Sequence, residues 1–78
     1  MKFIEKLNEK RALKKELQEC IDNVVLWDGV REELEETAKE VTNEEFAKSI
    51  NSQRKLASKK IQENFDRIIA IRKELESL

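Results

Sequence analysis

Two clusters of basic side chains have the type and spacing best suited to binding chemistry. On a helix, the first cluster covers roughly 140° of one face. It consists of Lys10, Arg11, Lys14 and Lys15, and the second cluster consists of Arg54, Lys55, Lys59 and Lys60. Cationic groups spaced in this way can contact phosphates by Coulomb attraction. No aromatic residue lies within either cluster to stack on a base. A solvated face paired with acidic residues is therefore favoured over nucleic-acid binding.

Catalytic chemistry has little support in the residue types. The chain contains no histidine, so Cys20 and the serines lack their commonest activator, and the Glu-x-x-His motif of carboxylate-bridged metal bundles cannot occur. The glutamates lie on the polar arcs of the expected helices, where burial cannot shift their pKa values for acid–base work. Cys20 is the only cysteine, and its apolar neighbours indicate a small buried hydrophobe. We expect no enzymatic activity and no catalytic, cofactor-binding or metal-binding residues.

The composition predicts one all-helical domain over residues 1–78. There is one glycine and no proline, so almost every backbone position can be helical. The net charge of −1 carries no general attraction to nucleic acid or anionic membranes. The first residues are interrupted by charge every second or third position, unlike a signal peptide or a membrane span. We therefore expect a cytoplasmic protein with no membrane partner.

Hydrophobic periodicity predicts a first helix at about 2–27. Its apolar residues recur at alternating steps of four and three, at Leu13, Leu17, Cys20, Val24 and Trp27. Gly29 then suggests a helix end, because glycine commonly adopts the left-handed conformation just past a C-terminus.

A second helix is expected at about 30–41 and a third at about 43–77. Thr42 and Glu45 have the spacing of a capping box, and Val41 and Phe46 have that of a hydrophobic staple. A continuous helix would also place Phe46 opposite the stripe that ends at Val41. A competing break lies at Asn51-Ser52, where both residues can cap a helix. The apolar phase of the third helix does not reset there.

The position of the second break decides between two architectures. A break at residue 51 gives a compact three-helix bundle, whereas a break at Thr42 gives a helical hairpin with a long C-terminal helix that outreaches the other two. Its last twenty residues would then have no intrachain neighbour and would require a second chain. This predicts a self-association interface at Ile61, Phe65, Ile68, Ile71 and Leu75.

Three further residues bear on packing. Trp27 is expected to fill the core beside the Gly29 turn rather than to form an exposed anchor. Gln53 and Asn64 lie on the apolar arc of the third helix. They either set the register inside a helix interface or lie at its edge.

The sequence as a whole favours a helical protein–protein interaction module that is homo-oligomeric, such as an adaptor, inhibitor or assembly factor. We expect it to form a bundle or short coiled coil and to bind itself, with another protein as a further candidate partner. Nucleic-acid binding through the basic clusters is the alternative. A designed scaffold without selected function is a third reading. The missing proline and histidine suit a design, while the lone cysteine and the like-charged pairs argue against one.

Overall fold

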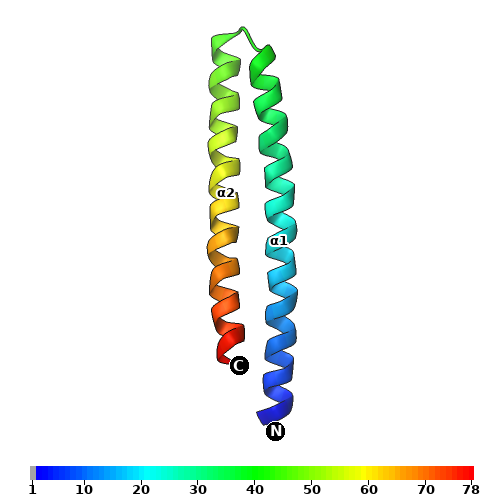
Figure 1. The fold of residues 1–78 in the computed structure, drawn as a ribbon. Helices are drawn as coiled ribbons and strands as arrows, with labels where there is room; N and C mark the ends of the chain where they lie inside the picture. Colours follow the sequence, from blue (N-terminus) through cyan, green and yellow to red (C-terminus); the bar gives the residue numbers. More distant parts are fainter. Residues whose placement is uncertain (1) are drawn as a thin grey trace.

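The chain folds into two long antiparallel helices, in a computed structural model that describes residues 2–78. Helix α1 spans Lys2–Glu40 and helix α2 spans Glu44–Ser77. Residues 41–43 connect them. Figure 1 shows the helices side by side, with both chain ends at the end opposite the connection. The molecule is a rod whose Cα atoms extend over 63 × 14 × 14 Å.

The core is a single seam between the two helices. Its buried residues are Leu13, Cys20, Ile50, Ala57, Ile61, Ile68 and Ile71. On both helices the buried and half-buried positions recur at alternating steps of three and four, which keeps one side of a long helix toward its neighbour. Fully burying one such aliphatic side chain contributes about 1.5–3 kcal/mol. Burial along this seam therefore holds the hairpin together.

Helix α1 continues through Gly29, so the predicted break there is wrong. Gly29 has no positive φ, and a Cβ built on it would have no neighbour within 4 Å. A glycine in a helix interior costs about 1 kcal/mol relative to alanine. The inward-facing positions stay in phase across it, from Val24 and Trp27 to Leu34. Burial of that continued stripe outweighs the cost of one glycine, and the expected helices 2–27 and 30–41 are one helix.

The second break lies where it was predicted, but a different residue caps the helix. The N-cap of α2 is Asn43, whose side-chain oxygen accepts from the backbone N–H groups of Glu45 at 2.9 Å and Phe46 at 3.2 Å. The predicted capping box on Thr42 is therefore wrong by one residue. Asparagine is at least as good an N-cap as threonine. Asn51 and Ser52 lie inside α2, which excludes the alternative break.

The fold is a helical hairpin, one of the two expected architectures, but it has two helices rather than three, and this removes one reason for expecting a second chain. The long α1 runs beside the whole of α2, so the C-terminal part of α2 has an intrachain neighbour. Ile68 and Ile71 pack with Leu13 and Cys20 in one cluster, and Leu75 packs against it.

Candidate interaction surface

The five residues predicted to form an interface have different environments. Ile61, Ile68 and Ile71 are buried in the seam, and Leu75 is half-buried against it. Phe65 is the exception, because 46% of it is exposed. Of these five residues, only Phe65 therefore presents a large accessible surface, and self-association through the set as a whole stays a prediction.

One side of the seam is closed by polar contacts between the helices, and we call it the ion-pair face. Arg67 on α2 donates two hydrogen bonds to Glu16 on α1, from Nε to Oε1 at 2.6 Å and from Nη2 to Oε2 at 2.8 Å. This two-point geometry is the strong form of an arginine–carboxylate pair. The hydrogen bonds from Arg67 lower the pKa of Glu16 and in turn raise that of Arg67. On the same face, closer to the connection between the helices, Asn23 Nδ2 lies 3.4 Å from Asn64 Oδ1.

The opposite side of the seam can be located from a shallow hollow near the connected end. Residues of both helices line this hollow: Arg31, Glu35, Asn51, Arg54, Lys55 and Ser58. The inward-facing positions of each helix repeat every seven residues, so residues seven or fourteen apart share a side. Ile21 lies fourteen residues before Glu35, and Phe65 lies seven after Ser58. Ile21 and Phe65 therefore lie on the same side of the hairpin as the hollow.

Four large apolar side chains gather on that side, which we call the apolar face. Val25 and Ile69 follow Ile21 and Phe65 by four residues, and this spacing keeps them on the same helical face. The contacts of Glu16 with Arg67 and of Asn23 with Asn64 place Ile21 and Phe65 at about the same height. Val25 is 68% exposed and Ile69 is 53% exposed. The middle of the hairpin thus presents an apolar surface made by both helices.

Charged residues flank the apolar face in a fixed order. On this face α1 carries Arg11 and Lys14 toward the open end of the hairpin, where the chain termini lie. Toward the connected end, where residues 41–43 join the helices, it carries Asp28, Glu32 and Glu35. These residues follow the same spacing of three and four as Ile21 and Val25, so they share their face. The apolar centre of α1 therefore separates a basic end from an acidic end.

The two basic clusters stay apart in the fold. Lys10, Arg11, Lys14 and Lys15 are all exposed on α1. In the second cluster, Arg54 Nη2 lies 3.8 Å from Glu35 Oε1, and Lys59 and Lys60 each lie 3.9 Å from Glu63. The clusters are roughly 25 Å apart along the hairpin at 1.5 Å per residue. The fold does not merge them into one basic surface, and nucleic-acid binding stays a prediction.

Four single-residue expectations can be compared with the structure. Cys20 is a buried free thiol in the core, as predicted. Trp27 is half-buried along the seam, away from any turn. Asn64 is half-buried between the helices, whereas Gln53 is exposed and bonds to Ser49 on its own helix. Asn64 therefore lies inside the helix interface and Gln53 outside it, and a role of Asn64 in setting the register stays a prediction.

Sequence reasoning missed three members of the apolar face, namely Ile21, Val25 and Ile69. The sequence does contain this second stripe. Its residues lie four apart on each helix and directly follow residues of the seam stripe, so the wider seam stripe dominates the periodicity.

Comparisons with family models, with characterised proteins and with solved structures find no match to this chain. Within residues 2–78 neither helix has a stretch apolar enough to cross a bilayer. In the same residues, no three acidic or cysteine side chains come together as a metal site would require.

Proposed function

We propose that this chain is a small, non-enzymatic, cytoplasmic helical module that acts by protein–protein contact and associates with itself, as coiled-coil and bundle proteins do. The observation that carries the proposal is the exposed apolar face made by Ile21, Val25, Phe65 and Ile69. Contiguous apolar surface shared by two elements is typical of interaction sites, whereas scattered single residues are not.

The total exposed area supports the same interpretation. The chain exposes 6347 Å², while a compact monomer of 9.2 kDa would expose about 4,900 Å² by the usual scaling with mass. The excess arises because a two-helix rod has a core only one seam wide. A partner on the apolar face would turn part of this surface into a second core layer.

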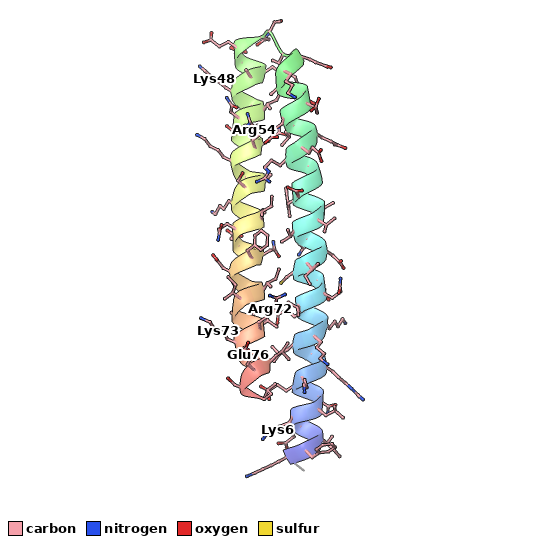
Figure 2. All side chains as sticks on the ribbon, viewed as in Figure 1. Lys6, Lys48, Arg54, Arg72, Lys73 and Glu76 are labelled. Carbon is pink, nitrogen blue, oxygen red and sulfur yellow. The ribbon has the colours of Figure 1, made fainter. Side chains whose placement is uncertain are left out.

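Site-specific photo-crosslinking tests the proposal. A photoreactive phenylalanine analogue replaces Val25 on the apolar face, and in a matched protein it replaces Lys73, which points away from α1 (Figure 2). We expect position 25 to form adducts with protein, either a second copy or another chain, and position 73 to form few. Equal yields at the two positions would contradict the proposal.

A further inference from the structure

We propose that the apolar face binds a second copy of this chain, face to face and antiparallel, across a two-fold axis. The axis runs perpendicular to the helices at the height of Ile21 and Phe65. Helix α1 then packs on α1 of the second copy, and α2 packs on α2, so that two hairpins form a four-helix bundle. This inference rests on the proposed function and names the occupant of its surface.

The chain as a whole exposes about 1,400 Å² more than a compact monomer of its mass, and this excess is spread over the entire rod. A stable interface of standard size buries about 800 Å² on each partner. The proposed dimer would therefore remove more than half of the excess. The four apolar side chains would form the centre of the interface, where residues of this kind contribute most of the binding energy.

The charge order on α1 is self-complementary under this axis. Lys14 lies seven residues before Ile21 and Asp28 lies seven after it, so each is about 10 Å from the axis. The two-fold rotation brings Lys14 of one copy opposite Asp28 of the other. It likewise brings Arg11, ten residues before Ile21, opposite Glu32, eleven residues after it. Each pair occurs twice because a two-fold interface is isologous.

The charges on helix α2 are also complementary about this two-fold axis. Lys55 lies ten residues before Phe65 and Glu76 lies eleven after it. The rotation therefore places Lys55 opposite Glu76 of the second copy, and Phe65 opposite its own counterpart. Figure 2 shows Glu76 and Arg72 near the open end of α2, far from the connection. Both helices thus select the same height for the axis.

The other face-to-face arrangement has less complete charge complementarity, because it opposes Arg11 to Glu76 and Glu32 to Lys55 but also brings two cations together. An axis parallel to the helices would lay α1 over α2 of the second copy and leave all heights unchanged. Lys14 would then face Arg72, which lies at its height because Leu13 packs with Ile71. Neither cation is neutralised inside the hairpin, since no ion pair within residues 2–78 involves Lys14 or Arg72. Like charges in direct opposition penalise an interface strongly.

A charge exchange between two variants tests this geometry. The acidic variant carries Arg11→Glu and Lys14→Glu, and the basic variant carries Asp28→Lys and Glu32→Lys. In the proposed dimer each variant opposes like charges when paired with itself, whereas a mixed pair has opposite charges at all four contacts. We expect each variant alone to associate at least about tenfold more weakly than the wild type. An equimolar mixture should form a heterodimer of wild-type affinity.

The control variant carries Lys15→Glu and Lys73→Glu, which reverse two lysines outside the apolar face. It should associate as the wild type does and should not pair preferentially with the basic variant. Sedimentation velocity and native mass spectrometry measure the species, and circular dichroism measures helicity. If either variant unfolds alone, recovery of helicity on mixing with the other variant reports the same heterodimer.

Two results overturn the inference, and they have different consequences. A wild-type dimer whose charge-exchanged variants do not pair would refute this axis and leave self-association through another geometry. A wild-type chain that stays monomeric to about 500 µM, well above the micromolar range of specific complexes, would refute the homodimer. Self-association would then drop out of the proposed function, and its remaining part, contact with another protein, would depend on whether position 25 crosslinks to one.

Discussion

Ile68 and Ile69 are adjacent residues of one type with opposite environments, and they represent two apolar surfaces of the hairpin. Ile68 is 8% exposed in the seam, whereas Ile69 is 53% exposed on the apolar face. The seam is covered by the other helix of the same chain, and the apolar face is not. Side-chain type therefore does not distinguish core from candidate interface in this molecule. Only the position relative to the neighbouring helix does so.

The largest expected effect directly tests the difference between the seam and the apolar face. Ile71 is fully buried, so Ile71→Ala should lower the free energy of unfolding by about 2–5 kcal/mol. Ile69→Ala removes the same atoms from an exposed position and should change it by less than about 0.5 kcal/mol in the monomer. Urea unfolding at a concentration where sedimentation shows a monomer provides the measurement. Equal losses for the two variants would mean that the seam and the apolar face are not distinct.

A second prediction concerns association rather than folding. Phe65→Ala should weaken self-association by about tenfold or more, because a central aromatic residue would be lost from both sides of the interface. Phe46→Ala is the matched control, since Phe46 is also exposed on α2 but lies on the side of the ion-pair face. Sedimentation equilibrium gives both constants. An equal loss in the control would place the interface elsewhere.

The cap of α2 stabilises the hairpin without belonging to either apolar surface. Asn43→Ala should cost about 0.5–2 kcal/mol, because two backbone N–H groups would lose their acceptor. Thr42→Ala should cost clearly less, since Thr42 is exposed and does not cap the helix. Thermal unfolding of both variants, compared at equal protein concentration, measures the difference. A larger loss for Thr42→Ala would restore the capping box expected from the sequence.

Gly29 gives a prediction of the opposite sign. Gly29→Ala should stabilise the chain by about 0.5–1 kcal/mol, because the position is helical and has room for a Cβ. A glycine in the left-handed conformation of a turn would give a loss instead. Chemical denaturation decides between these outcomes, and dimer affinity should not change.

The smallest expected effect is a pH dependence on the ion-pair face. The folded pKa of Glu16 is lowered by its hydrogen bonds from Arg67, below an ordinary value of 4.5. The carboxylate therefore adds stability above pH 4.5 that is lost as the pH falls through the folded pKa. The difference in stability between wild type and Glu16→Gln should shrink over that range. Glu33→Gln, which removes a carboxylate in no ion pair within residues 2–78, should show a flatter profile.

Much of the fold could be predicted from periodicity and local signals. The helical class, the burial of Cys20 and the end of a helix near Thr42 all follow from spacing and capping residues. The expected helix end at Gly29 is wrong because glycine is only a local signal. The apolar phase runs unbroken from Val24 through Trp27 to Leu34, and this indicates one continuous helix.

The candidate surface was less accessible to sequence reasoning. Phe65 was included in the predicted interface, but the neighbouring isoleucines proved to face the seam. A stripe on one helix does not reveal how much of its width the neighbouring helix covers. That depends on the length of α1 and on the side of α2 against which it packs.

The sequence by itself determined that this chain is helical, that one helix ends near Thr42 and which apolar positions share a stripe along each helix. These properties depend on residues within one or two helical turns of each other, or on the regular spacing of apolar residues along one helix. Only the tertiary structure decided that α1 continues past Gly29 and that one of two apolar stripes is covered. The physical reason is that burial against a second helix, summed along the seam, exceeds the cost of a single glycine.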